Sequence, residues 1–248
     1  MLRKLQKNIY MKLARHKVFY PLLFKILEKN GYLETEFDKR IRKYVAKNPS
    51  LFFVQIGAND GMKFDPTYLY VHKYKWRGIL VEPVSYVFDK LKENYKDSDG
   101  LIFENVAIGD KEGYKNFYLL KKSDKENLPL WYDEIGSFDK RHILKHAHRI
   151  QDIEKHMITE KVAVVTLQAL LKKHKVTKID ILQIDTEGYD YHVLKQIPFD
   201  KIKPSIIIFE DRHLTEKQKY LCQKLLADNG YITVRGIDCF AYLEEKIN

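Results

Sequence analysis

Acidic, amide and glycine residues gather at five short points of this 248-residue sequence, each directly after an apolar run. Residues 57–61 read Gly-Ala-Asn-Asp-Gly, residues 104–107 read Glu-Asn-Val-Ala, and residues 185–188 read Asp-Thr-Glu-Gly. The other two points are Glu82-Pro83 and the segment 210–213. Carboxylates bind cations and hydroxyl groups and act as bases, while glycines allow close backbone approach. The five points therefore predict one ligand site, provided that the fold brings them together.

The spacing disfavours a phosphate-bearing cofactor. A pyrophosphate site requires G-x-G-x-x-G with a helix N-terminus aimed at the anion. Here the loop has the spacing G-x-x-x-G with Asp60 inside it, and the next helix is expected only near Pro66. S-adenosylmethionine carries a sulfonium, an ammonium and ribose hydroxyls but no phosphate, so it suits this acidic rim better. A nicotinamide-dependent oxidoreductase remains as the disfavoured alternative.

Each predicted cofactor contact has a chemical reason. Gly57 and Gly61 let the backbone approach the cofactor, and Glu82 can accept hydrogen bonds from both ribose hydroxyls. Residues 105–107 would line the adenine, and Asp185 could meet the ammonium group or orient the acceptor. The predicted cofactor-binding residues are Gly57, Ala58, Asn59, Asp60, Gly61, Glu82, Pro83, Asn105, Val106, Ala107 and Asp185.

Strands that alternate with helices must position these points. Apolar runs predict strands over residues 51–56, 79–81, 101–108, 114–120, 162–165, 179–184 and 205–209. Capping residues and apolar periodicity predict six helices. The first three run from Thr35 to before Pro49, from Pro66 to Arg77, where Gly78 ends the helix, and onward from Glu82-Pro83. The other three follow Thr166, span residues 189–197, and run from Thr215 to Asn229. Residues 231–235 and 239–243 read as a terminal hairpin. The predicted fold is α/β, a doubly wound and mostly parallel sheet with an antiparallel C-terminal hairpin.

Four segments carry a resemblance to a known family: residues 54–61 (VQIGANDG), 81–83 (VEP), 105–110 (NVAIGD) and 184–188 (IDTEG). In order and spacing the sequence resembles the FkbM-type S-adenosylmethionine-dependent methyltransferases over about residues 50–243. The resemblance implies a class I methyltransferase fold and O-methylation, frequently of sugars or polyketide-type natural products. It also implies that the cofactor is held by Gly57, Ala58, Asn59, Gly61, Glu82 and residues 105–107.

Two positions depart from the family pattern. The family commonly has an acid where Gln55 stands, and another where Gln168 follows Thr166-Leu167. The first change removes a carboxylate near the methionine ammonium, which Asp60 or Asp185 could replace.

The reaction itself requires alignment and proton removal. The acceptor oxygen must be held about 3 Å from the methyl group, and a positioned base accelerates attack by a sugar hydroxyl by about 10²–10⁴-fold. His213 is the first candidate base, although a surface histidine beside a helix start is the alternative interpretation. Asp185 is the second candidate, and Glu210 completes the predicted catalytic set. A metal requirement stays open, because Asp185, Glu210 and Asp211 are similar to the carboxylates of magnesium-dependent catechol-type enzymes.

Residues 121–160 do not continue the alternation of predicted strands and helices. We interpret them as an insertion that caps the acceptor pocket. Trp131, Tyr132, Ser137 and Phe138 are expected to contact the acceptor, which is a sugar, glycan or small molecule, because aromatic faces stack on sugar rings. The same segment contains His142, His146 and His148. No carboxylate or cysteine nearby completes a ligand set, so we interpret these histidines as part of a solvated helix.

Positive charge is concentrated at the N-terminus. Residues 1–30 contain eight basic residues and one acid, which accounts for seven of the ten net positive charges of the chain. We therefore divide the sequence into a basic helical extension, residues 1–48, and a methyltransferase domain, residues 49–248. The extension could pack on the domain or a second subunit, or lie on anionic lipid. Nucleic acid is disfavoured, because no binding motif accompanies the charge.

Two cysteines, Cys222 and Cys239, are too few for a disulfide framework, and no apolar stretch approaches the roughly 18 residues of a membrane span. These features predict a cytoplasmic protein, with peripheral contact at the inner membrane face as an alternative. A non-catalytic, membrane-docked nucleoside-binding module is the corresponding alternative function.

Overall fold

A computed structural model describes residues 36–62, 65, 67–123, 128–129, 131–132, 135–236 and 238–247 of the chain. The chain divides into two compact units, residues 1–48 and 49–248. In the first unit the described part is helix α3 (Glu36–Lys47), which is the helix predicted between Thr35 and Pro49. Residues 1–35 of the predicted basic helical extension lie outside the described residues. Among the described helices none is long and apolar enough to cross a membrane.

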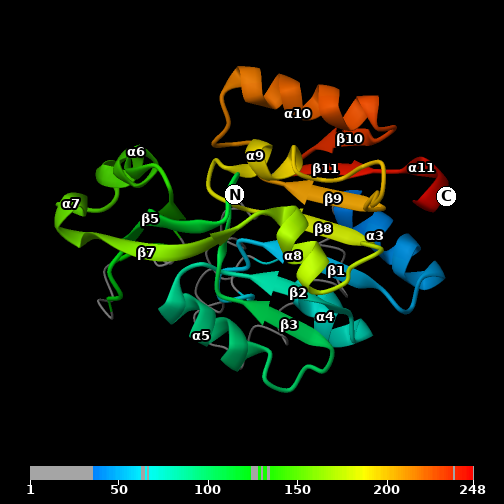
Figure 1. The fold of residues 1–248 in the computed structure, drawn as a ribbon, viewed down its shortest axis with the longest axis horizontal. Helices are drawn as coiled ribbons and strands as arrows, with labels where there is room; N and C mark the ends of the chain where they lie inside the picture. The colour runs from blue at the N-terminus through cyan, green and yellow to red at the C-terminus, as the bar shows by residue number, and fades with distance from the viewer. Residues whose placement is uncertain are drawn as a thin grey trace, which may run out of the picture. The chain divides into compact units, whose positions relative to one another are not determined.

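The second unit is built on a seven-stranded sheet of order β10-β11-β9-β8-β1-β2-β3 (Figure 1). Its strands are β1 (Phe52–Ile56), β2 (Arg77–Val81), β3 (Leu101–Glu104), β8 (Ile181–Ile184), β9 (Ile206–Phe209), β10 (Ile232–Arg235) and β11 (Cys239–Tyr242). Strand β11 runs antiparallel to both β9 and β10, and the remaining pairs are parallel. The predicted α/β fold, a mostly parallel sheet with an antiparallel C-terminal hairpin, is confirmed.

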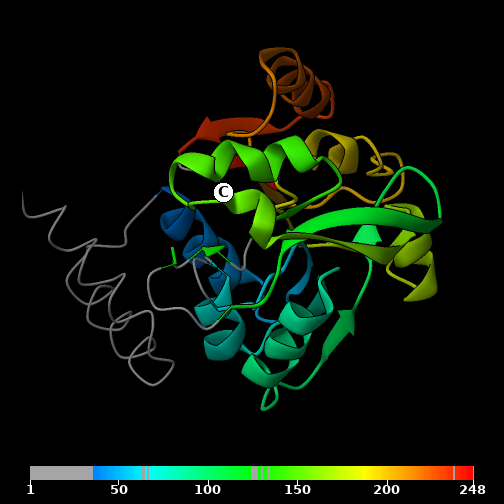
Figure 2. The same ribbon diagram turned by 90° about the vertical axis from the view of Figure 1, so that its left-hand side faces the viewer.

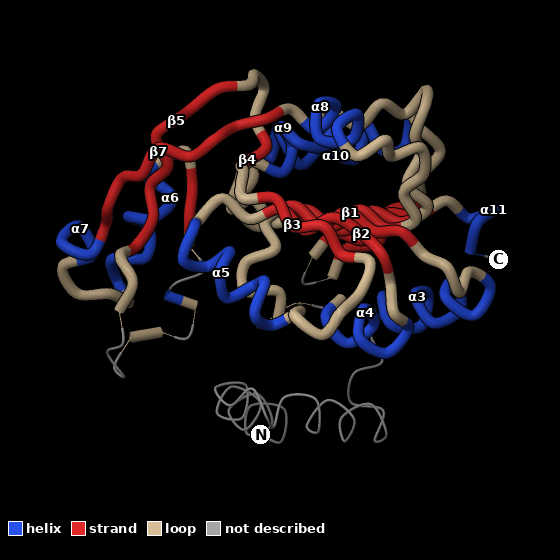
Figure 3. The backbone as a smooth tube through the Cα atoms, turned by 60° about the horizontal axis from the view of Figure 1, so that its bottom comes forward, coloured by secondary structure: helices blue, strands red, loops and turns tan. Residues whose placement is uncertain are grey.

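Helices cover both faces of this sheet (Figure 3). One face carries α8 (Leu167–Lys173), α9 (Asp190–Leu194) and α10 (Glu216–Asp228), whose apolar side chains join the sheet in one large core cluster. The other face carries α4 (Tyr68–Tyr74) and α5 (Ser85–Asn94). The short helix α11 (Glu244–Ile247) follows the hairpin. The sheet is therefore buried on both sides, which explains its near-continuous apolar strands.

A second sheet of order β4-β7-β5-β6 stands beside the first. It contains β4 (Ala107–Ile108), β5 (Gly113–Leu120), β6 (Gly136–Ser137) and β7 (Met157–Val165), with α6 (Lys140–Leu144), the 3₁₀ turn η2 (Lys145–His148) and α7 (Ile153–His156) between the last two. Figure 2 views the molecule from the side of this sheet, with α6 and α7 in front.

The second sheet corrects two sequence predictions. The single strand predicted over residues 101–108 is two strands, because the chain leaves the first sheet at Asn105 and enters the second at Ala107. The strand predicted at 162–165 begins at Met157, so residues 157–160 belong to the sheet and not to the insertion. Half-buried and exposed residues alternate over residues 158–161 of β7, and the strand pairs along the whole of β5, a pattern that an apolar-run criterion does not detect.

The helix predicted over residues 66–77 is shorter. Helix α4 ends at Tyr74, because Lys75 adopts the left-handed conformation with φ 53°. Gly78 does not end this helix but lies inside β2, where a Cβ atom would stand 2.3 Å from the carbonyl oxygen of Phe53 on the neighbouring strand. This glycine therefore permits close strand packing.

Candidate functional site

A cavity opens at the carboxyl ends of four parallel strands. The last residues of β1, β2, β8 and β9 all line it: Ile56, Val81, Ile184 and Phe209. Ligands of open α/β sheets bind at this edge. Six carboxyl side chains also line the cavity: Asp65, Glu82, Asp185, Glu187, Glu210 and Asp238. Among the described lining residues there is no lysine, arginine or histidine, so no cation of the wall itself pairs with these carboxyl groups.

The glycine-rich loop after β1 forms one side of the cavity. Gly57, Ala58 and Asn59 line it, whereas Asp60 and Gly61 do not. Gly57 has φ +78°, and a Cβ atom there would lie 1.7 Å from the carbonyl oxygen of Asp185. The absence of a side chain at Gly57 therefore lets the ends of β1 and β8 close on each other.

The rear of the same loop packs on α5. A Cβ atom on Gly61 would lie 2.4 Å from side-chain atoms of Leu91 and Tyr95. The Asp60 carboxylate accepts a hydrogen bond from the Met62 N–H at 3.0 Å, which stabilises the turn. The structure thus gives Asp60 and Gly61 packing and turn contacts behind the cavity wall.

Glu82 follows β2 and is held by the backbone. Its Oε2 accepts a hydrogen bond from the Asn59 N–H at 3.0 Å, and its Oε1 accepts one from the Val84 N–H at 2.8 Å. The side chain is 6% exposed. Burial raises the pKa of Glu82 to about 7, although both backbone hydrogen bonds lower it. The carboxylate is therefore fixed in position at the cavity wall and titrates near neutral pH.

Pro83 and residues 105–107, which were predicted to contact the cofactor, have two different positions in the structure. Pro83, Val106 and Ala107 line the cavity, but Asn105 does not. The Asn105 Nδ2 donates hydrogen bonds to the carbonyl oxygens of Glu82 at 2.8 Å and of Pro83 at 3.1 Å. Asn105 thereby ties this segment to the end of β2.

Asp65, a buried carboxyl group that lines the cavity, is absent from the site residues predicted from the sequence. The Gln55 Nε2 donates a hydrogen bond to Asp65 Oδ2 at 3.0 Å, and Asp65 Oδ1 accepts from the Thr67 N–H and hydroxyl at 2.7 Å each. Burial raises the pKa of Asp65. A carboxylate thus stands beside Gln55, at the position where the family's acid is missing.

Gln183 is the partner of Gln55 across β1 and β8. It also lines the cavity, and its buried Oε1 has no hydrogen-bond partner among the described residues. The sequence places a glutamine within each of two predicted apolar strands. Because a buried polar group requires a hydrogen-bond partner, these two glutamines could have been predicted to belong to a site.

Carboxylates crowd the opposite wall. Asp185 lines the cavity and is exposed there. Desolvation by the surrounding protein, and then repulsion by Glu187 and Glu210, raise the pKa of Asp185 well above the usual range. Burial and then Glu187 raise the pKa of Glu210 to about 8, while Arg212, 3.1 Å from its Oε1, opposes the shift. Crowded carboxylates with raised pKa values favour a cationic ligand.

His213 lies behind these carboxylates and not in the cavity lining. Its Nε2 lies 3.4 Å from Glu187 Oε2 and 3.5 Å from Glu210 Oε2. Desolvation lowers the pKa of His213 to about 4. Asp211 pairs instead with Arg235, at 3.1 Å, and does not line the cavity.

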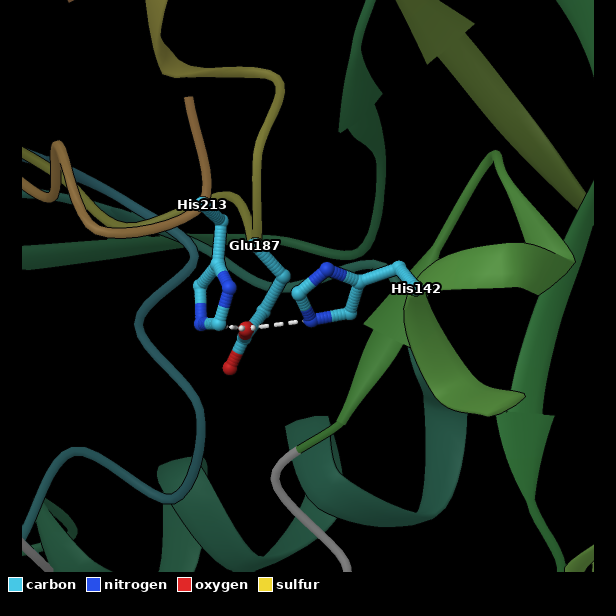
Figure 4. Close-up of side chains that lie close together, drawn as sticks. All are labelled: His142, Glu187 and His213. Carbon is cyan, nitrogen blue, oxygen red and sulfur yellow. Dashed lines mark ion pairs between the residues drawn. The ribbon is translucent and has the colours of Figure 1, made fainter. Parts of the chain in front are cut away.

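His142 joins the same cluster (Figure 4), which corrects its interpretation as a solvated helical histidine. It is 5% exposed, and its Nε2 lies 2.8 Å from Glu187 Oε2. Its ring meets that of His213 edge to face, with centroids 4.3 Å apart. Sequence distance hid this arrangement, because the three residues come from α6, the loop after β8 and the loop after β9.

Of the four residues expected to contact the acceptor, Phe138 lines the cavity. Its ring lies edge to face on Phe117 and Tyr189, with centroids 5.2 and 5.4 Å away. The other three are outside the lining. Trp131 packs on the His146 ring, the Tyr132 hydroxyl lies 2.8 Å from His156 Nδ1, and the Ser137 Oγ accepts a hydrogen bond from the Asp139 N–H.

Comparison with known proteins gives one family match. The family model described as methyltransferase FkbM domain matches residues 55–233. A methyltransferase FkbM structure from Methylobacillus flagellatus KT is 14% identical with a TM-score of 0.49; the alignment covers 78% of this chain and 44% of that one. The N-terminal domain of human METTL16 in complex with SAH is 11% identical with a TM-score of 0.42, covering 90% and 70%. This chain therefore spans less than half the length of the FkbM structure, and no curated protein matches it.

Proposed function

The chain belongs to the FkbM methyltransferase family, and from this membership we propose that it transfers a methyl group from S-adenosylmethionine to a hydroxyl group of a sugar, a glycan or a small natural product. The observation that carries the proposal is the cavity wall with six carboxyl side chains and, among its described lining residues, no cationic one. Such a wall attracts a sulfonium and an ammonium and repels a phosphate.

The donor groups of the cavity fit this cofactor. Glu82 offers carboxylate oxygens to the ribose hydroxyls, and Val106 and Ala107 offer an apolar edge to the adenine. Gln183 supplies an acceptor oxygen without a hydrogen-bond partner among the described residues, and Asp65 supplies a carboxylate nearby on the same floor. Both suit the ammonium group. We therefore assign the replacement for the family's acid at position 55 to Asp65, in addition to the earlier candidates Asp60 and Asp185.

When bound, S-adenosylmethionine supplies a methyl group that its sulfonium already activates. The protein then has to hold the acceptor hydroxyl in line and accept its proton. Asp185 and Glu210 are the proposed bases, because both carboxylates line the cavity. His213 does not contact the cavity, so we propose that it acts on the acceptor indirectly, through Glu187 and Glu210.

The acceptor would bind on the side of the second sheet. Phe117, Phe138 and Tyr189 form a continuous set of aromatic rings at the cavity wall, and the Lys115 Nζ lies 5.2 Å from the Phe138 ring centroid. Aromatic faces and a few polar groups are the usual means of binding a sugar ring. Residues 135–156, which precede β7, would complete the cap over this end of the cavity.

Calorimetric titration with S-adenosylmethionine, S-adenosylhomocysteine and NAD tests the cofactor. We expect uptake of the first two and none of the third; uptake of NAD alone would contradict the proposal. A screen of sugars, glycans and phenolic compounds with methyl-labelled cofactor then identifies the acceptor. Label on nitrogen or carbon, and not on oxygen, would contradict O-methylation.

A further inference from the structure

We propose that His142, Glu187 and His213 form a binding site for one divalent transition-metal ion at the wall of the cavity. The three side chains come from α6, the loop after β8 and the loop after β9, and all three meet at one point (Figure 4). One ligand atom from each lies within 4.8 Å of the other two. The site is separate from the magnesium-type carboxylate set considered from the sequence, because its ligands include two imidazoles.

The distances match those of a coordination sphere. The Glu187 Oε2 lies 2.8 Å from His142 Nε2 and 3.4 Å from His213 Nε2. An ion with bonds of about 2.0–2.2 Å to nitrogen and oxygen separates its ligand atoms by about 3 to 3.5 Å. The two separations from Glu187 are close to this range, and the ligand atoms of the two imidazoles lie within 4.8 Å of each other.

Two buried polar atoms, one in this cluster and one beside it, lack a hydrogen bond among the described residues. They are the Nε2 of His142, which is 5% exposed, and the Oε2 of Glu210, which is 7% exposed. The short contact of His142 with Glu187 does not have hydrogen-bond geometry. Glu210 Oε2 lies 3.5 Å from His213 Nε2. Buried polar atoms without partners are rare, and a cation between the three side chains would satisfy the His142 Nε2.

The backbone also holds Glu187 in an unfavourable conformation. Its φ of +53° is left-handed, a conformation that residues other than glycine seldom adopt. Gly188 follows with φ +98°, and the Cβ position there faces the side chains of His213 and His142 at 3.5 and 4.0 Å. This double turn is what directs the Glu187 carboxylate at the two imidazoles.

The donor set selects the class of ion. Two imidazoles and one carboxylate suit Zn²⁺, Fe²⁺, Co²⁺ or Mn²⁺, whereas Mg²⁺ and Ca²⁺ prefer oxygen ligands alone. Glu187 and Glu210 line the cavity, so open coordination positions of the ion would face the acceptor side. A bound ion lowers the pKa of a coordinated hydroxyl group. Binding of the metal stands independently; only this role rests on the proposed function.

Co²⁺ provides a direct spectroscopic test. The full chain is dialysed against EDTA, returned to metal-free buffer and titrated with Co²⁺ and then Zn²⁺, with calorimetry and visible absorption as readouts. We expect one Co²⁺ per chain, d–d absorption typical of nitrogen and oxygen ligands, and its loss when Zn²⁺ displaces the cobalt. Glu187→Gln and His213→Ala should weaken Co²⁺ binding by at least about 100-fold. Circular dichroism of each variant in EDTA verifies folding without metal.

His148→Ala is the matched control, because His148 lies one turn beyond α6 and is exposed. It should retain one equivalent of Co²⁺ and the unchanged spectrum. Absence of Co²⁺ binding by the wild-type chain, or wild-type binding by folded Glu187→Gln and His213→Ala, overturns the metal site. A normal Co²⁺ spectrum without uptake of S-adenosylmethionine would instead overturn the proposed function alone.

Discussion

Glu82 is a single carboxylate that two backbone N–H groups hold at the wall of the cavity, with a pKa near 7. The ionised form accepts hydrogen bonds from two ribose hydroxyls better than the protonated form does. We therefore predict that the affinity for S-adenosylmethionine rises about tenfold between pH 6 and pH 8, as Glu82 loses its proton. Calorimetry at constant ionic strength measures this change.

The Glu82→Gln variant separates this carboxylate from the other acids of the cavity. Its affinity should be lower at pH 8 and should depend less on pH between 6 and 8 than that of the wild type. An unchanged pH profile in Glu82→Gln would show that other groups cause the dependence and that Glu82 does not bind the ribose.

Gly57 offers a prediction about packing. Alanine there requires a left-handed conformation and places Cβ 1.7 Å from the Asp185 carbonyl oxygen, so Gly57→Ala must separate the ends of β1 and β8. We expect a loss of at least about 2–3 kcal/mol in the free energy of unfolding and loss of cofactor binding. Chemical denaturation and calorimetry are the measurements.

Gly230→Ala is the control for this change, since Gly230 has φ +85° with no atom within 4 Å of its Cβ position. The Gly230→Ala variant should lose only the conformational cost of the left-handed backbone, about 1–2 kcal/mol, without any steric clash. Equal destabilisation by Gly57→Ala and Gly230→Ala would contradict a steric role of the β1–β8 contact.

At the residue scale, the sequence identifies side chains whose position follows from a strand end. Glu82 and Asp185 could be placed at the cavity because each directly follows a buried strand. Asp65 and His142 could not, because a loop and a short helix bring them to the site. Gln183 could have been predicted as a site residue, because it is a glutamine within a buried strand.

At the scale of elements, the second sheet determines which aromatic residues reach the cavity. Phe138 follows β6 and lines the cavity, whereas Trp131 packs on His146 elsewhere in the insertion. We predict that Phe138→Ala raises the acceptor KM about tenfold, because it removes an aromatic face worth about 1 kcal/mol or more, and leaves cofactor affinity unchanged. Steady-state kinetics with the identified acceptor measure both values.

Trp131→Ala serves as the comparison, since sequence reasoning expected it to raise the acceptor KM as well. From its contacts we now expect a smaller effect than that of Phe138→Ala. If Trp131→Ala raises the KM more, the acceptor binds on the α6 side of the insertion and the proposed orientation is wrong.

Helix starts were predictable because their chemistry is local. The Thr166 side chain accepts a hydrogen bond from the Ala169 N–H, and Thr215, the predicted start of α10, forms a capping box with Gln218. The end of α4 and the start of β7 were not predictable in this way. Lys75 ends α4 in a left-handed conformation, which glycine usually adopts, and Met157 enters β7 only because β5 is there to pair with it.

At the scale of the whole molecule, charge is the feature that the methyltransferase site leaves unexplained. Seven of the ten net positive charges belong to residues 1–30, which lie outside the described residues. We predict that the full chain sediments with phosphatidylserine vesicles at low salt and not with phosphatidylcholine vesicles. Removal of residues 1–30 should reduce sedimentation at least about tenfold, since each basic residue near an anionic surface contributes about 1 kcal/mol.

Salt provides the control, because added NaCl should release the full chain from the vesicles. Equal sedimentation of the full and shortened chains would exclude lipid binding by residues 1–30. A change in oligomeric state on removal of these residues, with no change in vesicle binding, would instead support contact with a second subunit.

The overall topology was predictable and its second sheet was not. Alternating strands and helices allow few arrangements, and the hairpin over residues 231–243 indicated the antiparallel end. By contrast, the chain leaves the first sheet within two residues, Asn105 and Val106, and no turn signal marks that transfer.

The position of β11 has a consequence for synthesis. Strand β9, an entirely apolar and buried strand, has β8 on one side and β11 on the other, and β11 follows it about 30 residues later in the chain. While the nascent polypeptide leaves the ribosome, the edge of Ile206–Phe209 stays unpaired until residues 239–242 emerge. An uncovered apolar edge is a template for aggregation, so this interval exposes the growing chain to that risk.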